Sequence, residues 1–285
     1  IVANIDLASL SKPRPMTEEV VVGKDVLELL AGAMYADPLT IYREYVQNAA
    51  DAIDLARAQG LKPGEGFGVE ITLDRATRTI IVRDNGASIP ADEFVSRLTA
   101  IGASQKRGKA LRGFRGVGRL SGLGYCQELL FRGRAEGDAK VIELRWDGRK
   151  LRDLLRNPNY TGDLSSLIRS AVEIRKLPAE GQPSRFFEVE LRKVARLRGD
   201  LLLNDDNVRS YLAQVAPVPF HPEFSLGEKI TAHLRERGIR EPMQVRLAGD
   251  LEPIYHRARD HIAFGEKHKD AVQSVEFLEF LGQDG

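Results

Sequence analysis

The 285-residue sequence predicts an α+β fold, in which a mixed and mostly antiparallel sheet carries its helices on one face. The predicted order is helix, helix, hairpin, helix, glycine-rich loop, helix and then several strands. This order lacks the regular alternation of strands and helices that a doubly wound parallel sheet requires. Hydrophobic residues make up 42% of the chain and charged residues 29%, which is ordinary for a globular protein with one large domain or two.

The N-terminal part of the chain predicts an arm and two helices. Residues 1–22 include two prolines and are expected to form an extended arm, and residues 24–34 have helical periodicity. The second helix is expected to begin at Asp37-Pro38, because aspartate caps a helix and proline in the first turn loses no needed hydrogen bond. It is expected to run to about Gln59, with Gly60 as its stop.

Strand signals follow. Apolar and polar residues alternate over 69–73, and after residues 75–78 a second strand segment follows at 79–82, which predicts a β-hairpin. A short helix is expected over 91–100, and the glycines of residues 102–124 predict a long loop that leads into a helix over 117–125. The remaining expected elements are strands at 127–133, 140–145, 171–177 and 186–191 and a helix at 206–215.

Three prolines within residues 217–222 predict a domain boundary. We therefore divide the chain into an arm (1–22), a main domain (23–220) and a linker with part of a second α/β domain (221–285). The last part has its own strand signal at 243–247 and helix signal at 272–281. The chain is expected to stop partway through that second domain.

Composition limits the kinds of protein. The net charge of +1 implies no particular partner, and a single cysteine excludes an intrachain disulfide framework and a thiolate-rich zinc site. The five histidines have no convincing metal spacing. No run approaches the roughly 20 apolar residues that a spanning helix needs, and the N-terminus lacks the regions of a signal peptide. We expect a cytoplasmic protein with no membrane association.

The most informative motif lies in the second helix. Glu44, Asn48 and Asp51 recur at i, i+4 and i+7, which places them on one helical stripe. One interpretation is a row of solvated polar side chains. The other makes Glu44 a general base that polarises a water, with the amide oxygen of Asn48 on a magnesium ion.

Two further motifs follow along the chain. Asp84-Asn85-Gly86 follows a strand and is either a plain tight turn or an adenine site, in which Asp84 accepts from the exocyclic amine and Gly86 lets the backbone approach the ring. Gly113-x-x-Gly116-x-Gly118 precedes a predicted helix, where backbone N–H groups can cradle phosphates, although glycines can also serve flexibility alone. It is not a Walker loop, because no Gly-Lys-Ser/Thr follows.

In this order the three motifs resemble the ATPase domain of the GHKL superfamily, which includes type II topoisomerases, histidine kinases, MutL and HtpG-like heat-shock chaperones. The resemblance spans about residues 20–200 and is closest to the HtpG-like branch, which has a similar pattern before the first motif, at 27–30 and 41–44. It implies the Bergerat fold, a two-layer α/β sandwich with ATP between helices and sheet.

The resemblance also implies roles for individual residues. Glu44 would be the hydrolytic base, Asn48 the Mg²⁺ ligand and Asp84 the adenine-binding carboxylate. The other ATP-binding (or ADP-binding) positions that it implies are Asp51, Gly86, Ile89, Ser104, Lys106, Gly113, Gly116, Val117, Gly118 and Ser184. Two positions depart from the family pattern: Ser88 stands where a glycine is usual and would narrow the adenine pocket, and Ser184 replaces a late threonine expected around residues 183–185.

The implied function is Mg²⁺-dependent ATP binding and slow hydrolysis in a chaperone-like protein. ATP would close a lid and drive homodimerisation of N-terminal domains, with the arm 1–22 as an exchanged segment and a client protein as partner. Turnover is expected to be slow, because the cation that reaches the γ-phosphate comes from the next domain in the family. The alternative is an ATP-gated binding module or a DNA-linked ATPase, for which nucleic acid would contact Lys106, Arg107, Lys109, Arg112, Arg115 and Arg119.

Overall fold

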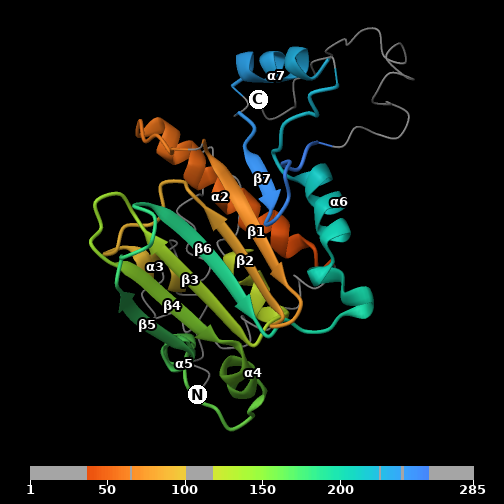
Figure 1. Cartoon of the computed structure of the whole chain (residues 1–285). Coiled ribbons are helices and arrows are strands. Elements are labelled where there is room, and N and C mark those ends of the chain that lie inside the picture. Colours follow the sequence, from red (N-terminus) through yellow and green to blue (C-terminus); the bar gives the residue numbers. More distant parts are fainter. Residues whose placement is uncertain (1–36, 65, 101–117, 225, 239–240, 257–285) are drawn as a thin grey trace, which may run out of the picture.

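The structure is a computed structural model of the chain, and it describes residues 37–64, 66–100, 118–224, 226–238 and 241–256 (Figure 1). Several expectations lie outside these residues: the arm over 1–22, the helices over 24–34 and 272–281, and most of the glycine-rich loop.

A seven-stranded sheet in the order β5-β4-β3-β6-β2-β1-β7 forms the centre of the described structure. All neighbouring strands are antiparallel except β1 and β7, which are parallel. The prediction of a mixed, mostly antiparallel sheet with helices on one face is confirmed (Figure 1). The strands are β1 (Gly68–Asp74), β2 (Thr79–Asp84), β3 (Glu128–Arg134), β4 (Val141–Asp147), β5 (Val172–Leu177), β6 (Phe186–Arg192) and β7 (Gln244–Leu247).

The edge strand β7 comes from the segment expected to belong to a second domain. It pairs in parallel with Gly68–Ile71 of β1. Further along the chain, the N–H of His256 donates to the carbonyl of Pro219 at 2.7 Å. Strand β7 therefore adds the segment after the prolines to the edge of the same sheet, and a domain division at residue 220 stays a prediction.

The long helix α2 crosses one face of the sheet (Figure 1). It spans Thr40–Ala58, close to the predicted range, and the carboxylate of Asp37 accepts from the N–H of Leu39 at 3.0 Å just before it. Gly60 ends it with φ +71°, a backbone conformation that glycine adopts without cost. The N–H groups of Gly60 and Leu61 then close on the carbonyls of Arg57 and Ala56, the two bonds of a Schellman cap.

The other helices differ more from expectation. The helix expected over 91–100 is confined to α3, and the helix expected over 117–125 is the 3-10 segment η2. Two helices that the sequence did not predict, α4 and α5, are each capped by an aspartate: Asp147 accepts from the N–H of Lys150 at 2.9 Å, and Asp163 from that of Ser166 at 2.7 Å. The bounds are α3 (Phe94–Thr99), η2 (Gly118–Gly124), α4 (Gly148–Arg156), α5 (Leu164–Ala171), η3 (Arg198–Leu203), α6 (Asp205–Val215) and α7 (Gly227–Glu236).

The core lies between α2 and the sheet. The apolar residues of α2 recur at helical spacing, as in Ile41, Tyr45, Ala49 and Ile53, and all are buried. They pack in one hydrophobic cluster with the inward-facing residues of the strands, such as Ile71 of β1. This packing fixes α2 against the sheet and therefore fixes the polar stripe that α2 carries.

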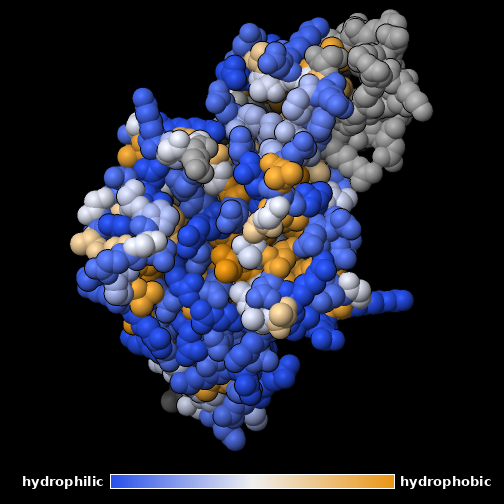
Figure 2. All heavy atoms as spheres, in the orientation of Figure 1, coloured by the Kyte–Doolittle hydropathy of each residue, from blue (hydrophilic) through white to orange (hydrophobic). Residues whose placement is uncertain are grey.

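The opposite face of the sheet carries an ion-pair network. Figure 2 shows that this face is largely hydrophilic, with hydrophobic surface near its middle. The guanidinium of Arg132 on β3 lies 2.7 Å from Glu143, 2.7 Å from Glu188 and 2.6 Å from Glu190, on the two neighbouring strands. These three carboxylates are buried, and the arginines of the network neutralise their charge.

Candidate nucleotide site

The polar stripe of α2 carries the first site residues. Glu44 and Asn48 are half-buried and Asp51 is buried, so the stripe is not fully solvated. One oxygen of Glu44, Oε1, pairs with Nη2 of Arg43 at 3.0 Å. The other, Oε2, lies against the backbone at Gly118, where an added Cβ would come within 2.1 Å of it. Only glycine at position 118 therefore accommodates the carboxylate in this place.

The segment η2 is fixed to α2 immediately beside Glu44. The hydroxyl of Tyr45 accepts from the N–H of Gly122 at 2.9 Å. Tyr45 is buried, and burial raises the pKa of its hydroxyl well above the usual value, so the ring stays neutral. The start of η2, which carries Gly118, is thus attached to the same helix that carries the predicted base.

The turn after β2 meets α2 further along. An added Cβ at Gly86 would come within 2.6 Å of the carbonyl carbon of Ala52 and 2.7 Å of the nitrogen of Ile53. The N–H of Ala87 donates to the carbonyl of Ala52 at 2.9 Å, although that carbonyl lies inside a helix. Gly86 is therefore required for close backbone contact between the turn and α2.

Asn85 attaches the turn to the start of β1. Its side-chain oxygen accepts from the N–H of Gly68 at 3.0 Å, and its amide donates to the carbonyl of Gly66 at 2.8 Å. Together with the contacts of Gly86, these bonds hold the turn from two sides. Asp84, the last residue of β2, is presented by a rigid turn.

The carboxyl group of Asp84 is only 5% exposed. It accepts from the N–H of Gly86 at 2.9 Å. Burial raises the pKa of Asp84 to about 7, and the hydrogen bond from Gly86 and the positive charge of Arg185 counteract that rise. A buried carboxyl group that titrates near neutrality can accept a hydrogen bond from a ligand amine when it is ionised.

The two ends of the site lie along one helix. Glu44 meets Gly118 at one end, and Ala52 meets Gly86 at the other. Ala52 follows Glu44 by eight positions, which corresponds to about 12 Å along the helix. Asn48 lies midway between these two ends. The candidate general base Glu44, the candidate metal ligand Asn48 and the turn that carries Asp84 therefore follow one another along the helix, as the phosphates, metal and purine of a bound nucleotide would require.

Two more residues lie after the turn. Ile89 is partly buried and packs against the core cluster. Ser88, at the position where a glycine is usual in the resemblance, has φ +61° and is buried. Its hydroxyl has no hydrogen-bond partner among the described residues, and it lies so close to β3 that a Cβ at Gly133 would come within 2.9 Å of it. The left-handed backbone explains why this position favours glycine.

The structure does not bring all predicted residues together. Ser104, Lys106, Gly113, Gly116 and Val117 lie outside the described residues. Ser184 is exposed, and its role stays a prediction. Next to it, Arg185 is buried against the turn that presents Asp84, a placement that sequence reasoning missed because one arginine before a strand carries no local signal.

Arg119, one of the basic residues considered for nucleic-acid contact, binds backbone carbonyls near the end of α3. Its guanidinium donates to the carbonyl of Arg97 and, at 3.0 Å, to that of Ala100. Burial lowers the pKa of Arg119. The side chain ties the C-terminal end of α3 to η2 and so supports the segment that holds Gly118.

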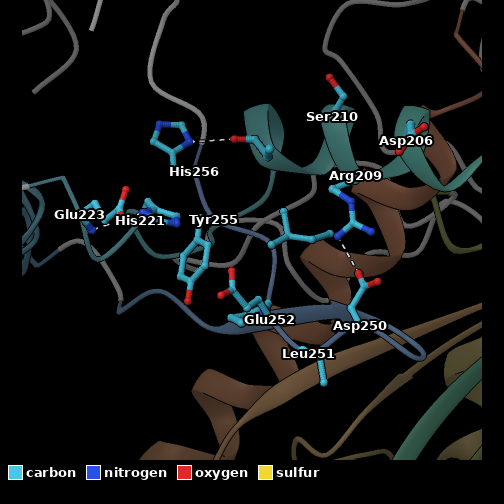
Figure 3. Close-up of a pocket in the computed structure, with 13 residues that line it drawn as sticks. Asp206, Arg209, Ser210, His221, Glu223, Asp250, Leu251, Glu252, Tyr255 and His256 are labelled. Carbon is cyan, nitrogen blue, oxygen red and sulfur yellow. Dashed lines mark hydrogen bonds and ion pairs between the residues drawn. The ribbon is translucent and has the colours of Figure 1, made fainter. Parts of the chain in front are cut away.

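A separate hollow of about 670 Å³ lies between α6 and the segment that follows β7 (Figure 3). Arg209 of α6 and Asp250 form an ion pair at 2.6 Å in its wall, and His256 contacts the carbonyl of Ala213 at 3.0 Å. Its other lining residues come from the same segments and from residues 221–223. None of the described residues that are predicted to bind nucleotide lines this hollow.

The described residues contain no group of three or more His, Cys, Asp or Glu side chains placed to hold a metal ion. No helix within the described ranges is both long and apolar enough to cross a membrane.

Comparison with known proteins agrees with the resemblance. Residues 39–160 match the family described as "Histidine kinase-, DNA gyrase B-, and HSP90-like ATPase". The chaperone protein HtpG of Chromobacterium violaceum is 30% identical over 142 residues, those of Burkholderia ambifaria 29% and of Bordetella pertussis 30%. The GHKL-type ATPase resemblance, with its HtpG-like affinity, is confirmed in this region.

The matched region is only part of each protein. Each of these alignments covers 44% of this chain and 22% of the relative. The chain thus spans about a fifth of the length of the curated relatives that it matches. The matched residues 39–160 include α2, the Asp84 turn and η2, and they exclude β6, which carries Arg185 at its start.

Proposed function

We propose that this chain binds ATP together with Mg²⁺ along the polar stripe of α2 and hydrolyses the γ-phosphate slowly. The observation that supports the proposal most directly is the pair of close contacts that two glycines make with α2. Gly118 abuts the Glu44 carboxylate at one end, and Gly86 abuts Ala52 at the other. The GHKL-type family match covers both contacts.

Asp84 would select and orient the base. When its carboxyl group is ionised, it accepts a hydrogen bond from the exocyclic amine of adenine. The turn is held by Asn85 and Gly86, so the acceptor is in position before ATP arrives. Such preorganisation lowers the entropy cost of binding.

Glu44 would act at the phosphate end. Because Oε1 is engaged by Arg43, Oε2 on the Gly118 side is the oxygen that would accept the proton of an attacking water. The water oxygen would bond to the γ-phosphorus as the bond to the β-phosphate oxygen breaks. Turnover is expected to be slow, because the resemblance implies that a further cation must reach the γ-phosphate from the next domain.

The residues present suit a magnesium ion. Mg²⁺ binds through few protein oxygens and takes its other ligands from phosphates and water, so a single amide oxygen is a sufficient protein contribution. Asn48 is half-buried and lies one helical turn from Glu44, in the middle of the stripe. When bound, the ion would neutralise phosphate charge, and Asn48 would fix the position of the ion relative to the general base Glu44.

Calorimetric titration with ATP, with and without Mg²⁺, tests this proposal together with a phosphate-release assay. Glu44→Ala should still bind ATP but lose hydrolysis, and Asp84→Asn should lose binding. Matched controls are Glu236→Ala and Asp92→Asn, which change exposed residues that take part in neither contact. Wild-type protein that binds neither ATP nor ADP would refute the proposal, as would hydrolysis that survives in Glu44→Ala.

We also propose a role for the whole protein. The HtpG similarity supports a chaperone-like protein. We further propose that it acts in the cytoplasm, and that ATP closes a lid over the phosphates and promotes dimerisation of N-terminal domains. Size measurements with and without a nonhydrolysable ATP analogue test the dimerisation. If Glu44→Ala dimerises like the wild type, the nucleotide acts as a binding switch rather than through turnover.

A further inference from the structure

We propose that Arg185 is a positioning residue for base recognition, which fixes the Asp84-Asn85-Gly86 turn and keeps its carboxylate able to accept a hydrogen bond from an amino-bearing purine. The inference rests on the proposed nucleotide site, and it adds the residue on which the choice between purines depends.

The geometry of Arg185 is that of a structural clamp. Its Nε and Nη2 both donate to the carbonyl oxygen of Asn85, at 3.3 and 3.2 Å. Its Nη1 pairs with the carboxylate of Glu136 at 3.1 Å. The side chain is only 7% exposed, whereas Glu136 is 53% exposed. A buried guanidinium whose donors reach the backbone of a turn restricts that turn strongly.

The sheet places Arg185 beside the turn. Arg185 immediately precedes β6, and Phe187 of β6 is the cross-strand partner of Asp84. The turn is thus held from three directions: by β1 through Asn85, by α2 through Gly86, and by the start of β6 through Arg185. Of these three contacts, only the one from Arg185 brings a charge.

That charge acts on Asp84. The carboxyl group is surrounded by the N–H of Gly86 from its own turn and by the Arg185 guanidinium from the β6 side. The α2 side presents the backbone of Ala52 and Ile53, beside the buried acid Asp51. Burial raises the pKa of Asp84 to about 7, and Arg185 opposes that rise. Without Arg185, more of the carboxyl group would be protonated at neutral pH.

The ionisation state decides which purine is recognised. An ionised carboxylate only accepts hydrogen bonds, so it pairs with the 6-amino group of adenine and repels the 6-oxo group of hypoxanthine. A protonated carboxyl group can donate and would tolerate the 6-oxo group. Arg185 therefore favours ATP over inosine triphosphate through Asp84 and without touching the base itself.

Calorimetric titration with ATP and inosine triphosphate between pH 6 and pH 9 tests this. Arg185→Met keeps the apolar stem and removes the charge and the donors. We expect its ATP affinity at pH 7 to fall about fivefold if the pKa of Asp84 rises by one unit, and to recover by pH 9. Its preference for ATP over inosine triphosphate at pH 7 should fall as well. Arg185→Lys should retain most of both properties.

Two further variants sharpen the test. Glu136→Gln removes the exposed counter-charge of Arg185, so ATP binding should persist to lower pH than in the wild type, the opposite direction to Arg185→Met. This variant serves alone if Arg185→Met does not fold. Arg175→Met, which alters an exposed arginine on β5, should match the wild type in affinity and pH profile.

The outcomes distinguish a failure of the proposed function from a failure of the role proposed for Arg185. If wild-type protein binds no adenine nucleotide, the proposed function fails. If the wild type binds ATP but Arg185→Met keeps its affinity, pH profile and purine preference, the proposed function stands and the inference is overturned. An equal loss of ATP and inosine triphosphate at every pH also overturns it, because that loss indicates only a scaffold role.

Discussion

The contact between Gly118 and Glu44 makes a sharp prediction for Gly118→Ala. An added Cβ would lie 2.1 Å from Oε2 of Glu44, whereas ordinary contact begins at 3.4 Å, so the oxygen must move by about 1.3 Å. It can do so because the obstacle is the end of a flexible side chain rather than backbone. A displacement of about 1 Å of a reacting group can cost about 100-fold in rate. We therefore expect kcat for ATP hydrolysis to fall by roughly that factor, while ATP affinity and the melting temperature change little.

Steady-state phosphate release at saturating ATP measures this effect, and calorimetry and thermal unfolding measure the other two quantities. Gly64→Ala is the matched control, because an added Cβ there meets nothing within 4 Å. If Gly118→Ala folds, binds ATP and hydrolyses it at the wild-type rate, then the position of Glu44 does not matter to the chemistry. The assignment of Glu44 as the base would then be wrong.

Three other perturbations follow from the described contacts. Gly86→Ala forces a Cβ against the backbone of α2, and we expect a loss of about 1–3 kcal/mol in urea unfolding, together with weaker ATP binding. Asp84 holds a proton in the folded state that the unfolded chain releases above about pH 4, so stability of the nucleotide-free protein should fall as pH rises from 4 to 7, by at most about 4 kcal/mol. Asp84→Asn should abolish that slope, and an unchanged slope would contradict the placement of the proton. Arg132→Met leaves the buried carboxylate of Glu143 without a cation among the described residues and removes one of the two described cations of Glu188 and of Glu190. It should cost about 3–5 kcal/mol in urea unfolding, whereas the exposed pair removed by Arg175→Met should cost less than about 1 kcal/mol.

The parts of the fold that local sequence patterns determine could be predicted from the sequence. The hairpin of β1 and β2 was predicted because apolar residues alternate along β1 and a second strand segment follows a short connection. Helix α2 was predicted because its apolar residues recur at helical spacing and Gly60 marks its end. The strands β3 to β6 were predicted within one or two residues of their bounds. In each case one segment contains the whole signal.

Other features could not be predicted because they depend on distant partners. The capping aspartates Asp147 and Asp163 are plain signals only once the ends of the neighbouring strands are known. The pairing of β7 with β1 joins residues more than 170 positions apart, and the local sequence of Gln244–Leu247 does not indicate which strand is its partner. Arg185 and Asn85 are likewise brought together by the neighbourhood of β6 and β2 in the sheet.

The described contacts imply that the two ends of the site respond differently to change. At the base end, Gly86 meets the backbone of α2, and the turn is also tied to β1 and to Arg185, so a change there displaces elements of the fold. At the phosphate end, Gly118 meets only the tip of the Glu44 side chain. A side chain can rotate at a cost of about 1 kcal/mol, whereas a packed backbone cannot move without loss of its neighbours' contacts. Substitutions at the base end should therefore lower stability and affinity together, and substitutions at the phosphate end should lower turnover alone.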